Sequence, residues 1–119
     1  MPRYLLLLYA SDVDAADRAA RWAEMPEWEK VTNSLAEAGL LVENAGLHMP
    51  EMATTVRVRE GETTLTDGPF AVTKEILGGF YLLDCADLDE AVAAAARLPM
   101  ARYGSIEVRP VLTVEDIPG

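Results

Sequence analysis

Cysteine and histidine are nearly absent from this chain of 119 residues, which contains one of each, Cys85 and His48. A single cysteine cannot form a disulfide within the chain, which fits a reducing compartment, and we expect a cytoplasmic protein. Zinc and iron sites are built mainly from histidine and cysteine side chains, so we expect no dedicated metal site. The sequence also lacks a phosphate-binding loop and a dinucleotide-binding glycine motif, so we expect no cofactor.

Basic residues are half as numerous as acidic ones, ten against twenty, and the formal net charge is −10. A surface of this sign repels phosphate backbones and anionic lipids, so we expect neither nucleic acids nor membranes as partners. No apolar run approaches the about 20 residues that cross a bilayer. The run over residues 4–10 follows an arginine, as in a signal peptide, but acidic residues come soon after it. We therefore interpret it as a buried strand.

The remaining composition is that of a soluble globular protein. Half of the residues are apolar and a quarter are charged. At this length we expect a single domain over residues 1–119 with its own apolar core.

The apolar pattern predicts six strands and three helices. Strands are expected over residues 3–9, 39–45, 54–59, 62–66, 78–84 and 105–111, with Glu60-Gly61 as the turn of a hairpin. Helices are expected over about 15–23, from Pro26 to before Gly39, and from Asp87, with a capping-box partner at Glu90, to before Pro99. The predicted inward faces are Trp28, Val31, Leu35 and Ala38 on the second helix, and Leu88, Val92, Ala95 and Ala96 on the third.

This order of elements predicts an α+β ferredoxin-like sandwich, in which an antiparallel sheet has its helices on one face. In strand 54–59, Val56 and Val58 are expected to face the helices. In strand 105–111, Ile106 and Val108 are expected to do the same, with Arg109 on the opposite face.

The uncovered face of this sheet is the predicted contact between two copies. Strands 3–9 and 78–84 are apolar on both alternating sets of side chains, which is typical of strands covered on both faces. We therefore expect a homodimer in which the two uncovered faces enclose a partly polar cavity. The alternative is a solvated face with cross-strand ion pairs between Glu107 and an arginine.

The segment DGPFAVTKEILGGFY, residues 67–81, is the richest in turn and charged residues. Asp67-Gly68 predicts a turn, Pro69 interrupts strand pairing, and Thr73 is expected to cap a helical turn over residues 74–77. The glycines at 78 and 79 are expected to permit close backbone approach. Each part of the segment therefore has a structural use.

A narrower, functional interpretation concerns the charged residues of this segment. Asp67, Lys74 and Glu75 are placed to reach the rim of the cavity between two sheets. Asp67 is the candidate general base or ligand acceptor, with Arg57 and Arg109 as candidates to hold an anionic part of a ligand. Lys74, Glu75 and His48 are further candidates for ligand contacts.

The motifs DGPF, TKE, GGFY, DLDEA and EVRPV, in this order, resemble those of the YCII-related family, in particular its DGPF branch. The resemblance runs from the first strand to Val111. It implies a ferredoxin-like fold that pairs into a dimeric α/β barrel. Many members of the branch are linked to genes for extracytoplasmic-function sigma factors. The wider superfamily includes cofactor-independent enzymes similar to muconolactone isomerase.

The resemblance also implies candidate residues. In one branch a histidine and an aspartate are a proposed catalytic pair; the aspartate corresponds to Asp67, whereas the histidine falls on Trp28. An indole does not exchange protons near neutral pH, so Asp67 needs other partners here.

Three hypotheses follow. The first is a cofactor-independent enzyme or ligand-binding protein for a small organic molecule, held in a homodimer. The second is a non-catalytic accessory or regulatory protein that acts through protein contacts, in the sigma-factor setting that the resemblance implies. The third is a member without activity, whose motif only maintains the fold.

Overall fold

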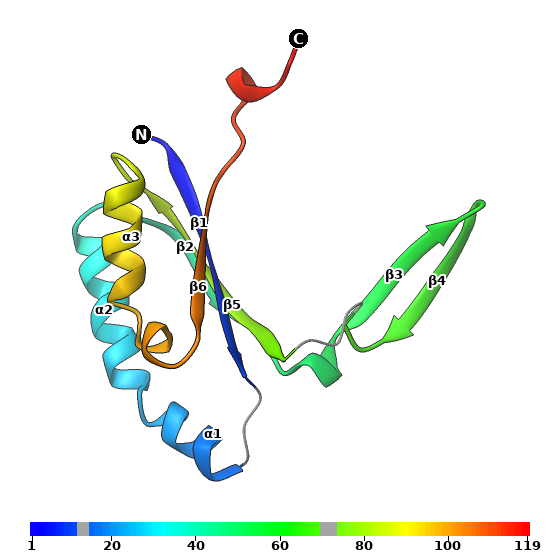
Figure 1. The fold of residues 1–119 in the computed structure, drawn as a ribbon, viewed down its shortest axis with the longest axis horizontal. Coiled ribbons are helices and arrows are strands. Elements are labelled where there is room, and N and C mark those ends of the chain that lie inside the picture. The colour runs from blue at the N-terminus through cyan, green and yellow to red at the C-terminus, as the bar shows by residue number, and fades with distance from the viewer. Residues whose placement is uncertain (12–14, 70–73) are drawn as a thin grey trace.

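The computed structural model describes residues 1–11, 15–69 and 74–119 of the chain. Four strands form one antiparallel sheet in the order β2-β5-β1-β6, and helices α2 and α3 cover one of its faces (Figure 1). The strands of this sheet are β1 (Arg3–Ser11), β2 (Leu41–Gly46), β5 (Glu75–Asp84) and β6 (Ser105–Pro110). The helices are α1 (Ala15–Trp22), α2 (Met25–Glu37) and α3 (Leu88–Ala96). The predicted ferredoxin-like α+β fold is therefore confirmed.

The core lies between the sheet and its helices. Alternate residues of β1, including Leu6 and Leu8, are buried toward the helices, while the residues between them are half-buried on the opposite face. Val31 and Leu35 supply the buried side of α2, as predicted, and Trp28 is half-buried. The prediction that Ala38 faces inward is wrong, because this residue is the exposed C-cap of the helix. Cys85 is fully buried just after β5, and burial raises the pKa of its thiol. This cysteine is a small core residue with little thiolate character.

Helix α3 contacts the core through small side chains. Its buried residues are Ala91, Ala94 and Ala95, whereas Leu88 and Val92 are exposed. Of the predicted inward face, only Ala95 is buried; the prediction that Leu88, Val92 and Ala96 face inward is wrong. Methyl side chains let the helix approach the sheet closely, and this close packing excludes the larger residues.

Two side-chain hydrogen bonds fix the start of α3. The Asp87 side chain accepts a hydrogen bond of 2.9 Å from the Glu90 amide, and the Glu90 side chain accepts one of 2.8 Å from the Ala86 amide. The predicted cap at Asp87 is confirmed, but the predicted capping box is not complete, because Glu90 accepts from the residue before the cap and not from the Asp87 amide.

Replacing the cap tests how much it stabilises the fold. Asp87→Ala is expected to lower the free energy of unfolding by about 1 kcal/mol, because the Glu90 amide loses its acceptor. Denaturant unfolding measures the change, and Asp89→Ala, two residues along, is the control for lost negative charge. Equal effects of the two substitutions would contradict a capping role.

Glycines shape the start of β5. Leu8 pairs with Gly79 and Tyr9 pairs with Leu77, so Gly78 is the extra residue of a β-bulge. An added Cβ at Gly79 would lie 2.6 Å from the Ala45 carbonyl oxygen, so the predicted close backbone approach is confirmed there. The predicted helical turn over residues 74–77 is wrong, because the segment from Glu75 already pairs with β1. Thr73, its predicted cap, lies outside the described residues.

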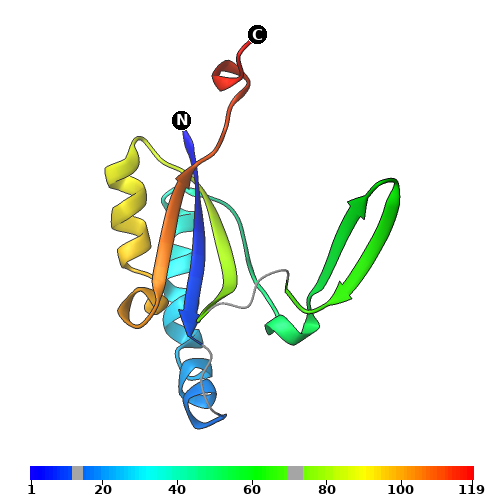
Figure 2. The same ribbon diagram turned by 45° about the vertical axis from the view of Figure 1, so that its right-hand side comes forward.

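Strands β3 (Thr54–Arg59) and β4 (Glu62–Asp67) form a separate two-stranded sheet that projects away from the main one (Figures 1 and 2). Glu60 and Gly61 have φ values of 52° and 80°, as a tight hairpin turn requires. The radius of gyration, 16.6 Å, exceeds the roughly 13.5 Å of a compact chain of this length.

The position of this hairpin overturns one prediction. Val56 and Val58 do not meet the helices; they are 59% and 57% exposed, and their neighbour across the hairpin, Leu65, is 66% exposed. Alternation correctly places them on one face of a strand. It does not determine which sheet the strand joins, because that depends on pairing partners distant in sequence.

The face of the main sheet opposite the helices, here called the open face, is apolar at its centre. Leu5 and Leu7 of β1 pair with Leu82 and Phe80 of β5, and all four are half-buried. On the neighbouring edge strand, Arg109 and Glu107 lie opposite Leu5 and Leu7. No other element covers this apolar centre within the described ranges.

Candidate ligand-binding site

A cavity of about 680 Å³ lies on the helix-covered side of the sheet, between helices α1 and α2 and the strands β2 and β5. Its apolar lining comprises Leu8, Trp22, Met25, Trp28, Ala45, Leu47, Tyr81, Met100 and Tyr103. Its polar lining comprises Arg21, Glu29, Thr32, Asn33, Asn44 and His48. Mostly apolar walls with a few polar groups are typical of small-molecule sites.

The floor of the cavity is formed by strand backbone without side chains. Gly46 of β2 pairs directly with Gly79 of β5, and both line the cavity together with Gly78. An added Cβ at Gly46 would have no heavy atom within 4 Å. Gly46 therefore leaves open space where a side chain would otherwise project, whereas the Cβ direction of Gly79 is filled by the backbone of β2.

One wall consists of stacked aromatic rings. Trp28 of α2 and Tyr81 of β5 have ring centroids 6.3 Å apart and an interplanar angle of 16°. The Tyr81 hydroxyl shares a hydrogen bond of 2.6 Å with the Thr32 hydroxyl, which fixes the buried phenol ring. Of the aromatic residues that the structure describes, four line this cavity: both tryptophans, Tyr81 and Tyr103.

Arg21 brings a positive charge to the α1 end of the cavity. Its Nη1 donates a hydrogen bond of 2.9 Å to the Ser11 carbonyl, and its guanidinium lies 4.6 Å from the centroid of the Tyr103 ring. A guanidinium has five N–H donors, so the Ser11 bond leaves donors that a ligand can use.

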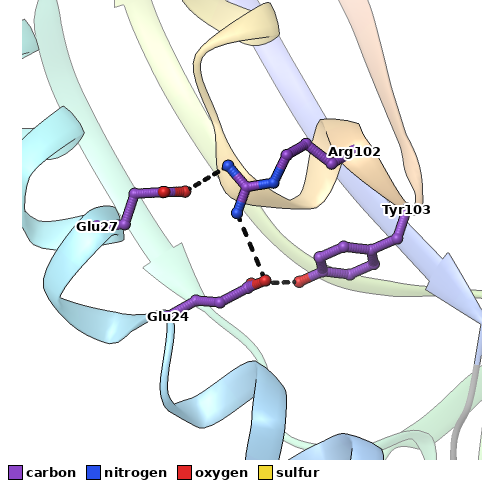
Figure 3. Close-up of polar contacts among 4 residues, drawn as sticks. All are labelled: Glu24, Glu27, Arg102 and Tyr103. Atoms are coloured by element: carbon purple, nitrogen blue, oxygen red, sulfur yellow. Dashed lines mark hydrogen bonds and ion pairs between the residues drawn. The ribbon is translucent and has the colours of Figure 1, made fainter.

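The junction of α1 and α2 is tied to the turn before β6 by a polar cluster (Figure 3). Arg102 contacts Glu27 at 2.6 Å and Glu24 at 3.5 Å, and the Tyr103 hydroxyl donates a hydrogen bond of 2.9 Å to Glu24. Hydrogen bonding to Glu27 raises the pKa of Arg102. This cluster, Glu24, Glu27, Arg102 and Tyr103, holds the wall from which Arg21 and Trp22 project.

Burial, with a smaller contribution from the hydrogen bond to Glu24, raises the pKa of Tyr103 to about 12 from an ordinary value of 10.0. Between these values the folded chain retains a proton that the unfolded chain releases, so stability must fall as the pH rises. The contribution of Tyr103 is complete below about pH 10 and is lost as the pH rises through about 12.

The ultraviolet absorbance of tyrosinate measures this titration in the folded protein. Tyr103→Phe is expected to remove a component that titrates near pH 12. It is also expected to weaken the loss of stability at alkaline pH. An unchanged titration curve in the variant would contradict the predicted environment of this hydroxyl.

The comparisons with known proteins add the family. The family model of the YCII-related domain matches residues 2–115. The chain belongs to the YCII-related family. An uncharacterised protein of Rhizobium meliloti (strain 1021) is similar to this YCII-related protein, with 48% identity over 89 residues, which are 73% of this chain and 72% of the relative. The family resemblance seen in the sequence is therefore confirmed. Because the relative is uncharacterised, its similarity does not indicate an activity.

The structure separates the six residues predicted for the site of this YCII-related protein. His48 lines the cavity, just beyond β2. Asp67 is exposed at the end of β4, where it pairs with Thr54, and Arg57 is exposed on β3. Neither residue lines the cavity.

The other three predicted residues also lie outside the cavity lining. Lys74 is exposed just before β5, and Glu75 pairs with Ser11 where that strand begins. Arg109 is exposed on the open face of β6. The predicted roles of these residues in a shared dimer cavity remain predictions, because they depend on a second copy.

Most of the cavity lining was not predicted from the sequence; among these residues, Arg21, Trp22, Trp28 and Tyr103 supply a positive charge and aromatic rings. Trp28 was assigned to the core because it fits the apolar stripe of α2. One feature of the sequence does indicate a site here. The two tryptophans lie six residues apart, on either side of the junction between two helices, and so do not belong to one apolar stripe. Within the described parts of the chain, no cluster of potential metal ligands occurs and no helix is long and apolar enough to span a membrane.

Proposed function

We propose that this YCII-related protein binds a small, largely apolar organic molecule in the cavity between α1, α2, β2 and β5. The observation that carries this proposal is the cavity itself. Its volume, about 680 Å³, lies within the range of small-molecule sites. Binding is favoured over turnover because the predicted base, Asp67, is not among the lining residues. His48 is the predicted site residue that lines the cavity.

The rim of the cavity supports the same proposal. Trp22 is 71% exposed, and two further lining residues, Met25 and Leu47, are also exposed. Large apolar side chains gathered at the mouth of a cavity are typical of binding sites, because a ligand removes them from water. Burying such surface contributes roughly 25 cal/mol per Å² before the losses on association.

Intrinsic fluorescence tests the proposal directly, because both tryptophans line the cavity. A panel of small organic molecules is screened for saturable changes in tryptophan emission and for raised melting temperature. We expect at least one compound to produce both effects at the same concentration. If no compound in a chemically broad panel produces either, the binding function is wrong.

We also propose that two copies pair through their open faces. The apolar centre formed by Leu5, Leu7, Phe80 and Leu82 is self-complementary, and Glu107 and Arg109 at its edge carry opposite charges. A two-fold axis can bring the arginine of one copy near the glutamate of the other. The family resemblance supports the same dimer.

Sizing with light scattering tests the dimer. The wild-type protein is expected at twice the monomer mass of 13.0 kDa at micromolar concentration. Leu7→Glu is expected to give a folded monomer, because it places a charge at the centre of the contact. A Val56→Thr, Leu65→Thr variant of the hairpin is the control and should stay dimeric. A wild-type monomer would contradict the proposal.

A second candidate function is action through contacts with another protein. The exposed apolar side chains of the hairpin, Val56, Val58 and Leu65, favour it, because a two-stranded hairpin is marginally stable alone and gains from a partner. If the hairpin variant loses a biological effect but still binds the ligand, the protein acts through contact with another protein. If it keeps the effect, this candidate is wrong.

A further inference from the structure

We infer that the cavity is selective for planar aromatic molecules that carry a carboxylate, with the ring on the Gly46–Gly79 floor and the carboxylate at Arg21. This inference rests on the proposed binding function and names the class of ligand.

The preference for a flat ring follows from the floor and the wall. Gly46 and Gly79 lie opposite each other in the register of β2 and β5, which lets the two strand backbones approach closely, and Gly46 leaves open space for a ring where a side chain would project. Trp28 stacks on Tyr81 beside this floor, and Tyr81 is held by Thr32. Offset stacking between aromatic rings contributes about 0.5–1.5 kcal/mol beyond the area that is buried. A planar ligand can use both surfaces.

The preference for an anion follows from the charges at the α1 end. Arg21 lines this cavity and also a smaller neighbouring one, of about 120 Å³, which Arg18 of the same helix lines as well. The nearby acids Glu24 and Glu27 are both in contact with Arg102. Two arginines of α1 therefore gather here in a chain whose net charge is −10. A guanidinium can bind a carboxylate through two parallel hydrogen bonds.

A cationic aromatic ligand is the main competing class, because aromatic rings also bind cations. Arg21 already lies over the Tyr103 ring at 4.6 Å, so that ring face is occupied by a cation. A second positive charge beside Arg21 would be repelled. Glu29 lines the cavity from α2 and is exposed, so water screens its attraction for a cation.

The test compares three probes with the same ring and different charges: naphthoate, naphthalene methanol and naphthyl trimethylammonium. Dissociation constants come from tryptophan emission and from calorimetry with the full chain. We expect naphthoate to bind at least about tenfold more tightly than the alcohol, because its carboxylate can form a charge-assisted hydrogen bond with Arg21. The ammonium compound is expected to bind most weakly.

Two variants test whether Arg21 causes the preference for naphthoate over the alcohol. Arg21→Gln is expected to erase the difference between naphthoate and the alcohol while the alcohol still binds. Arg59→Gln is the matched control, because Arg59 also donates to a backbone carbonyl, at 3.0 Å, but lies on the hairpin. It should leave both affinities unchanged. Melting temperatures of both variants report any loss of stability separately from the ratio of affinities.

Several results would overturn the inference. Equal affinity of wild type for naphthoate and the alcohol, or tightest binding of the ammonium compound, shows that the site does not select carboxylates. A preference that survives in Arg21→Gln gives that arginine a purely structural role. If no naphthyl probe binds but another compound from the broad panel does, this inference fails and the binding function stands.

Discussion

Gly79→Ala is expected to lower the free energy of unfolding by about 3 kcal/mol, at the upper end of the usual effect of overpacking. The added Cβ would lie 2.6 Å from the Ala45 carbonyl oxygen and 3.3 Å from the Gly46 Cα. Both obstacles are backbone atoms of the neighbouring strand, so β2 and β5 must move apart to accept the methyl group. Denaturant unfolding of the variant and the wild type measures the loss.

The matched control is its partner across the sheet. Gly46→Ala adds the same methyl group where no heavy atom lies within 4 Å, and its φ is not in the left-handed region. It is expected to change stability by less than about 1 kcal/mol. If the two substitutions are equally destabilising, the close approach of the strands at Gly79 is not the reason for that glycine.

The second large effect concerns the cavity. Gly46→Phe is expected to weaken the binding of any planar ligand more than about tenfold, because the new ring occupies the floor. The position is open and lies at the end of a strand, where an aromatic residue is compatible with the backbone. Calorimetric titration with a compound that binds the wild type measures the loss.

Two controls separate this effect from damage to the fold. Gly46→Ala should retain binding within about threefold, because a methyl group leaves most of the floor free. The melting temperature of Gly46→Phe without ligand should remain near that of the wild type. Unchanged affinity in Gly46→Phe would mean that the ligand does not lie on the Gly46–Gly79 floor.

Much of the fold can be predicted from the sequence because its signals are local. Alternation and turn residues define the strands, and Asp87 with Glu90 defines the start of α3. The inward face of α3 was missed because hydrophobicity alone favours Leu88 and Val92, whereas close packing selects the alanines. The sheet to which β3 and β4 belong depends on long-range pairing, which local patterns do not encode.

The candidate site is harder to predict for the same reason. Its lining joins Arg21, Trp28, Gly46 and Tyr103, which are distant in sequence and are brought together by the sheet register and the turn before β6. The sequence favours Asp67 because it lies in a motif that is rich in turn and charged residues. In the structure, the glycines at the end of that motif form a bulge and a cavity floor.

A variant with a single tryptophan shows most directly whether a ligand binds in the cavity. In a Trp22→Phe variant the remaining tryptophan is Trp28, which lines the cavity against Tyr81. Titration with naphthoate is predicted to change Trp28 emission saturably and to raise the melting temperature over the same concentrations. If calorimetry shows naphthoate binding while Trp28 emission stays unchanged, the ligand binds elsewhere and the cavity is not its site.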